Sequence, residues 1–155
     1  MNSYATLEYA DAFLASLLGT DGWTQATDGD KERALGSATL AIDTLETNPG
    51  LRGTRKTPDQ AQAFPRSFEE GVSDTVKQAC CLEAAALLED NADPAAKRRE
   101  RAIRQGVVSE SVGDASESYV KRSELAQGGT SALRSPAALA LLHPYRTIQG
   151  VYPIR

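Results

Sequence analysis

The spacing of apolar residues predicts helices over most of the chain. A first helix is expected from about Thr6 to Leu18, with Thr6 as a candidate N-cap and Gly19 ending it. Asp28 or Asp30 can cap a second helix, which is expected to end before Asn48. The apolar positions of each helix fall on one side, at Leu7, Ala10, Leu14, Leu17 and Leu18 in the first and at Leu35, Ala38, Ile42 and Leu45 in the second. We expect the two helices to pack on each other.

A third helix is predicted from Asp74 to about Asp90, with Ser73 or Asp74 as its cap. Its apolar residues lie on nearly every side, which is typical of a helix at the centre of a fold. A very polar helical segment is expected at 95–104, and a short helix at 137–142, started by Ser135-Pro136. The segment 49–72 has no clean period and predicts a long loop that is functional or structured by a partner.

One stretch, 107–120, predicts a β-hairpin. Val108 and Val112 have strand-like spacing before the turn residues Gly113-Asp114, and a second short strand resumes at Ser116. A lone hairpin is only marginally stable, so it is expected to lie on the helices or on another copy of the chain. The predicted fold is therefore mainly α: a bundle of about four helices with a hairpin at residues 1–146, and an extended tail at 147–155.

Composition narrows the classes of protein. The chain has 155 residues, enough for one domain with a sizeable core. Its formal charge of −4 argues against a protein around which duplex DNA wraps. The adjacent Cys80 and Cys81 are unsuited to a structural disulfide and fit a reducing compartment. With no apolar run of membrane-spanning length and no signal-peptide pattern, we expect synthesis in the cytoplasm and no membrane contact.

Catalytic and metal-binding patterns are not evident in the sequence. The single histidine, His143, is better interpreted as a capping or packing residue than as a catalytic one. The acids around Asp28 lack the glycine and glutamate of a calcium loop, and the two cysteines have no companion pair for zinc. We expect no enzymatic activity, no metal and no cofactor.

Glu83 is unusual because its helical phase places it on an apolar face, where an unpaired carboxylate would cost several kcal/mol. Two interpretations remain open: an ion pair with a partner such as Arg66, or a face that is partly exposed.

Positive charge is concentrated at 97–104. A solvated helix face and a contact with an acidic protein surface or DNA phosphates are the alternatives. We favour a protein partner, because no aromatic residues for base stacking lie among the charges. The basic residues are Lys97, Arg98, Arg99, Arg101 and Arg104.

The C-terminal tail carries three sizeable apolar residues in an extended, proline-containing segment. Such a segment can dock in a groove or add a strand to a neighbouring sheet, although it could also fold back over its own core. The candidate docking residues are Val151, Tyr152, Pro153, Ile154 and Arg155.

The order of several short motifs resembles a known family. These motifs are Tyr4-Ala5, Ala10-Asp11-Ala12-Phe13, Gly53, Gln60, Phe64-Pro65-Arg66, the helix at 76–88, the hairpin and the closing Leu-Leu-His-Pro-Tyr. Together they resemble the head-to-tail adaptor (connector) proteins of tailed bacteriophages, some of which are labelled DnaT-like single-stranded DNA-binding proteins. The resemblance covers roughly residues 4–146, and the order of the motifs carries more weight than any one of them.

This resemblance implies a structural role in the virion neck. Such adaptors form a ring, expected to be twelvefold, below the portal protein and above the next neck protein, and genomic DNA passes through the channel without sequence-specific contact. Gln60, Phe64, Pro65 and Arg66 would then fix the long loop for ring packing, together with Gly113 and Tyr119 in the hairpin. Phe64 stands at a position where tryptophan or another large apolar residue is common in the family.

The alternative function is a single-stranded DNA-binding module. In that case the basic residues of 97–104 would contact the DNA backbone and tyrosines would stack on bases.

Overall fold

The computed structural model describes residues 2–92, 109–112, 115–118 and 133–147, and this part of the chain is mainly helical. The N-terminal half contains α1 (Leu7–Leu14), α2 (Asp21–Gln25), α3 (Asp28–Thr44) and a π-helical turn, η1 (Glu46–Gly50). A long loop then leads to α4 (Asp74–Ala92). Near the C-terminus, α7 (Pro136–Leu142) continues into the 3₁₀ turn η2 (His143–Tyr145).

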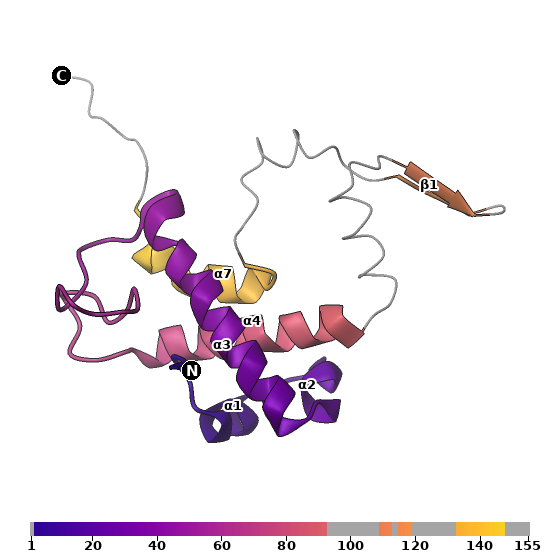
Figure 1. Cartoon of the computed structure of the whole chain (residues 1–155), viewed down its shortest axis with the longest axis horizontal. Coiled ribbons are helices and arrows are strands. Elements are labelled where there is room, and N and C mark those ends of the chain that lie inside the picture. Colours follow the sequence, from indigo (N-terminus) through magenta and orange to yellow (C-terminus); the bar gives the residue numbers. More distant parts are fainter. Residues whose placement is uncertain (1, 93–108, 113–114, 119–132, 148–155) are drawn as a thin grey trace.

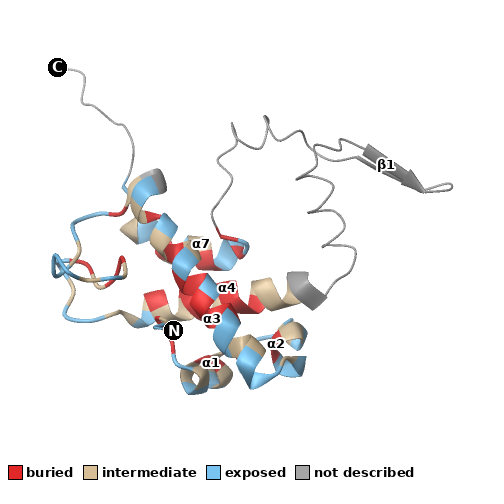
Figure 2. Ribbon diagram, viewed as in Figure 1, coloured by how far each residue is buried: buried red, intermediate tan, exposed pale blue. Residues whose placement is uncertain are grey.

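Helix α4 is the centre of the fold, as its apolar composition predicts. It packs against α1, α2, α3 and α7, and α3 crosses it in Figure 1. The buried residues gather where α3, α4 and α7 meet (Figure 2). The small buried side chains of α4 allow several helices to approach its axis closely; they are Ala79, Cys80, Ala84 and Ala85. Both cysteines are free thiols in this core, and burial raises the pKa of Cys81 to about 12.

The predicted second, third and last helices are confirmed as α3, α4 and α7. The expected stripe on α3, Leu35, Ala38, Ile42 and Leu45, is buried. Ser135 caps α7 by accepting a hydrogen bond from Ala138 N at 3.2 Å. The cap of α3 is Thr27 rather than Asp28 or Asp30. Its hydroxyl accepts from Asp30 N, which leaves both aspartates in the first turn, where negative charge favours a helix N-terminus.

The first helix is shorter than predicted. Thr6 caps it as expected, but α1 ends at Leu14 because the following N–H groups bond three residues back, Leu17 N to Leu14 O at 3.0 Å, as in a 3₁₀ turn. Leu17 and Leu18 are consequently exposed rather than part of the buried face. The sequence around Trp23 forms the short helix α2.

Two strands pair within the predicted hairpin segment. β1 (Ser109–Val112) runs antiparallel to β2 (Ala115–Ser118), with Val112 opposite Ala115. Gly113 and Tyr119 lie outside the described residues, as do the basic segment 97–104 and the tail residues 151–155. No helix in the described ranges has the length and apolarity needed to cross a membrane.

Glu83 has a partner, but it is the backbone of α7 rather than Arg66. Its carboxylate, in a residue 1% exposed, accepts hydrogen bonds from Arg134 N and Ser135 N, both at 2.8 Å. These N–H groups belong to the residues just before α7, so the Glu83 carboxylate links α4 to the start of α7. The negative charge also lies at the positive end of the α7 helix dipole.

Replacing Glu83 by alanine should lower the free energy of unfolding by about 2–5 kcal/mol, because one buried and one partly buried N–H group lose their acceptor. Glu83→Gln should cost less, since one amide oxygen still accepts. Urea unfolding at pH 7 measures both, with Glu32→Ala on exposed α3 surface as a control expected to change stability by less than about 0.5 kcal/mol. Equal stability of Glu83→Ala and the control would show that the contact is not needed.

Candidate functional site

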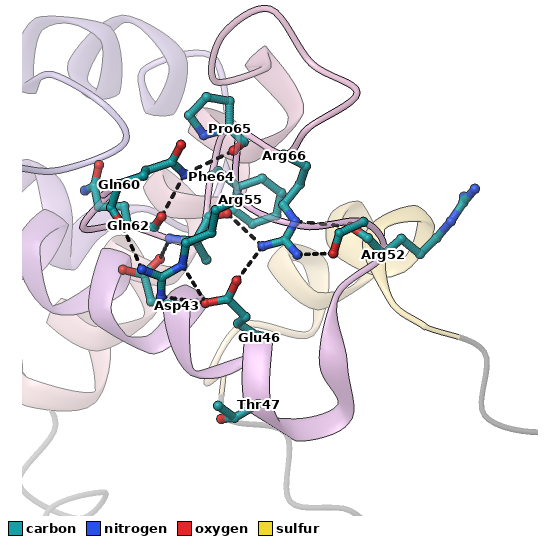
Figure 3. Close-up of polar contacts among 12 residues, drawn as sticks. Asp43, Glu46, Thr47, Arg52, Arg55, Gln60, Gln62, Phe64, Pro65 and Arg66 are labelled. Carbon is teal, nitrogen blue, oxygen red and sulfur yellow. Dashed lines mark hydrogen bonds and ion pairs between the residues drawn. The ribbon is translucent and has the colours of Figure 1, made fainter. Parts of the chain in front are cut away.

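The long loop between α3 and α4 is closed around a buried guanidinium, that of Arg66, which is 2% exposed. Arg66 donates four hydrogen bonds: to Glu46 Oε1 at 2.7 Å and to the carbonyl oxygens of Arg52, Gly53 and Ala63 at 3.1, 2.5 and 2.9 Å. Figure 3 shows the guanidinium pointing into the ring of acceptors formed by the loop and the turn after α3. The loop therefore has a fixed conformation despite its length.

A second arginine shares the same carboxylate. Arg55 donates to Glu46 Oε2 from Nε at 2.9 Å and from Nη2 at 2.6 Å, and its Nη1 reaches Gln60 O at 2.6 Å. The adjacent guanidinium of Arg55, and next that of Arg66, hold the pKa of Glu46 below its usual value. One carboxylate thus forms ion pairs with both guanidiniums, and the three groups together keep a net charge of +1.

The residues that the resemblance singled out in this loop lie together. The Gln60 side-chain amide donates to Gln62 O at 2.8 Å and Pro65 O at 3.0 Å. Phe64 is buried and contacts the N-terminal segment. Its N–H donates to Tyr4 Oη at 3.1 Å, and the Tyr4 hydroxyl donates to Asp43. The peptide bond between Phe64 and Pro65 is cis. Whether these residues pack against other copies of the chain stays a prediction.

Aromatic rings continue from this interior to the surface. Phe64 contacts Tyr145 edge to face, with ring centroids 5.1 Å apart. The ring of Tyr145 is nearly parallel to that of Phe68, with centroids 6.3 Å apart and an interplanar angle of 19°. The Tyr145 hydroxyl donates to Glu69 Oε1 at 2.8 Å and shares a hydrogen bond with Ser73 at 2.7 Å, and burial raises its pKa. Phe68 is 59% exposed although it is a large apolar side chain. Its exposed ring is stacked on the ring of Tyr145.

Two arginines adjoin Tyr145 along the backbone. Arg52 N donates to Tyr145 O at 2.8 Å, and Leu51 forms an antiparallel bridge with Arg146, so the start of the loop is paired with the segment after α7. Figure 3 shows the Arg52 guanidinium extending away from Glu46. Within the described ranges, neither Arg52 nor Arg146 forms an ion pair with a carboxylate. We call Arg52, Phe68, Tyr145 and Arg146 the aromatic–arginine face.

This face offers groups suited to binding. It can stack a planar group on Phe68 and hold an anion with two guanidiniums. Where the structure describes the chain, no group of histidine, cysteine and acidic side chains could hold a metal ion. His143, exposed at the end of α7, caps that helix as one of the sequence interpretations expected.

Sequence reasoning missed all four residues of the aromatic–arginine face. The long loop was identified as functional or partner-structured, and Tyr145 closes the quoted Leu-Leu-His-Pro-Tyr motif, but neither signal places the two segments together. The candidate residues at 97–104 and 151–155 lie outside the described part of the chain, and their roles stay predictions.

Comparison with known families gives one match. A family described as "Putative DnaT-like ssDNA binding protein" matches residues 1–152. No curated protein sequence and no solved structure matches the chain.

Replacing Glu46 by glutamine should lower the free energy of unfolding at pH 7 by about 1–3 kcal/mol, because a buried arginine loses its counter-ion. The pKa of Glu46 is lowered in the folded state, so the stabilisation is present above about pH 4.3, the unfolded value, and is lost as the pH falls through the folded value. The difference in the free energy of unfolding between wild type and Glu46→Gln, called the stability gap below, should therefore become smaller at acid pH.

Urea unfolding at pH 7, 5 and 3 measures this gap. Glu70→Gln, an exposed acid of the same loop, is the matched control and should give almost no gap at any pH. A gap for Glu46→Gln that stays constant down to pH 3 would mean that the ionised carboxylate contributes nothing.

Proposed function

Because the chain belongs to the family of DnaT-like ssDNA-binding proteins, we propose that it binds single-stranded DNA through the aromatic–arginine face. The observation that carries this proposal is an exposed aromatic ring, stacked on a second ring whose backbone neighbours are two arginines that form no ion pair with a carboxylate among the described residues.

Phe68 supplies the stacking platform. Proteins that bind single strands stack bases on aromatic side chains, and each such contact contributes about 1–3 kcal/mol. The Tyr145 ring stacks on the Phe68 ring. Gly53 also packs close to Phe68, since a Cβ on residue 53 would lie 3.1 Å from the Phe68 ring. The ring is therefore ordered before binding, which limits the conformational entropy lost when a base stacks on it.

The arginines supply the electrostatic part of the interaction. Arg52 is exposed and Arg146 half-buried, and within the described ranges neither would have to leave a carboxylate in order to bind a phosphate. Base stacking combined with a few backbone phosphate contacts is typical of binding that tolerates different sequences.

The overall charge of −4 limits this proposal to a local contact. A duplex needs an extended basic surface to neutralise many phosphates, whereas a few nucleotides of single strand need only one cationic patch. Single strands also expose the base faces that Phe68 would stack on. We therefore expect preference for single-stranded over duplex DNA.

Phe68→Ala should weaken binding to a single-stranded oligonucleotide by about 5- to 150-fold, equivalent to about 1–3 kcal/mol of lost stacking. Fluorescence anisotropy with a labelled oligothymidine at fixed salt measures the change. The control is Leu40→Ala, which removes an exposed apolar side chain of α3 and should leave the affinity unaltered. Equal losses in both variants, or none in either, would contradict the assignment of this face.

A second proposal is the structural head-to-tail adaptor of a tailed phage, a ring component of the virion neck without catalytic activity. It is supported by the resemblance in motif order and by the loop interior, where Gln60, Phe64 and Arg66 are all engaged in the contacts that fix the loop. The partners would be other copies of the chain, the portal protein and the next neck protein, with the tail at 151–155 and the basic segment at 97–104 as docking candidates.

Under this second proposal, multi-angle light scattering should detect a ring whose mass is a multiple of 16.5 kDa, alone or with the portal protein of the same genome. Truncation after Ile148 should abolish portal capture while leaving helical content unchanged by circular dichroism. A full-length chain that stays monomeric and ignores the portal would rule out the adaptor role.

A further inference from the structure

A basic pocket opens beside the aromatic–arginine face. It has a volume of about 360 Å³ and lies between the start of the long loop and the segment after α7. Two backbone hydrogen bonds hold its walls together, Arg52 N to Tyr145 O at 2.8 Å and Thr147 N to Gly50 O at 3.0 Å. The basic pocket is lined by Arg52, His143, Pro144, Arg146 and Thr147.

The charge in this pocket is one-sided. Three other arginines of the described chain are each paired with an acid: Arg33 with Asp30, and Arg55 and Arg66 with Glu46. Among the described residues, no aspartate or glutamate lines the basic pocket, and the Arg52 side chain donates to a carbonyl, Pro144 O, at 3.3 Å. Two arginines thus line an open cavity to which the described residues supply no carboxylate.

We propose that the basic pocket is a phosphate-binding site that holds one phosphodiester of a bound single strand. This inference rests on the proposed DNA-binding function and adds the position of the backbone contact. Guanidinium groups present a fork of N–H donors that matches phosphate oxygens in pairs, and His143 provides a further ring nitrogen at the rim. The volume exceeds that of a phosphate group and leaves room for the attached sugar.

The position of the pocket fits the stacking platform. Arg52 pairs through its backbone with Tyr145, which lies between two lining residues of the pocket, Pro144 and Arg146, and whose ring stacks on Phe68. A nucleotide whose phosphate occupies the pocket would therefore extend an adjacent base toward Phe68. The two contacts together would fix the direction in which the strand crosses the face.

The test combines two charge-removing variants, Arg52→Gln and Arg146→Gln, singly and together, with Arg33→Gln as the matched control. The double variant should weaken oligothymidine binding by about tenfold or more and reduce the slope of log affinity against log salt by about 0.7, the value for one lost phosphate on a single strand. Arg33→Gln, near the start of α3, should alter neither quantity. Thermal melting verifies that each variant is folded.

A second arm uses inorganic phosphate on the wild-type protein, followed by the NMR shifts of the arginine Nε–H groups, with chloride at matched ionic strength as the reference. Phosphate should shift Arg52 and Arg146 but not Arg33. Binding of the oligonucleotide that depends on Phe68 but is unaffected by the double substitution would overturn the pocket and leave the DNA-binding function standing.

The opposite result separates the two proposals as well. If the wild-type protein binds no oligonucleotide but phosphate shifts both pocket arginines, the pocket is a site for a free phosphate group and the DNA-binding function fails. If neither ligand has an effect, both proposals are wrong.

Discussion

The conformation of the whole loop depends on one buried cation, the guanidinium of Arg66. A charge in this position is tolerable only when its donors are satisfied, and a buried arginine without its counter-ion costs several kcal/mol. Glu46 and three loop carbonyls meet that need at once, so the loop must close around the side chain for the protein to be stable. What would otherwise be a long flexible connection becomes a rigid part of the surface.

The exterior site follows from this interior. Two of the carbonyls that Arg66 holds belong to Arg52 and Gly53, and Gly53 has a φ of 70°, where a side chain would be strained and would press on Phe68. The same segment pairs through its backbone with Tyr145, whose ring lies between the buried Phe64 and the exposed Phe68. The aromatic–arginine face is thus rigid because the charge network behind it is rigid, which is the condition for binding without a large ordering cost.

Hydrophobic periodicity was sufficient to predict the central architecture. It located α3, α4 and α7 and identified α4 as the buried helix, because those features depend on spacing within a single segment. It could not pair Glu83 with the N–H groups of Arg134 and Ser135, or Arg66 with Glu46, because each contact joins segments far apart in the sequence. The site was missed for the same reason: Phe68 and Arg52 are unremarkable residues of a polar loop until Tyr145 is brought against them.

An acidic protein can bind DNA if the positive charge is concentrated where the nucleic acid meets it. At physiological ionic strength charges separated by more than about 8 Å are largely screened when exposed, so the distant acids that produce the net charge of −4 have little effect at one pocket. Local neutralisation matters more: Glu46 pairs with Arg55 and Arg66 of the loop, whereas Arg52 and Arg146 form no ion pair with a carboxylate among the described residues. This difference between the two sets of arginines allows a single loop to serve both stability and the proposed recognition of a phosphate.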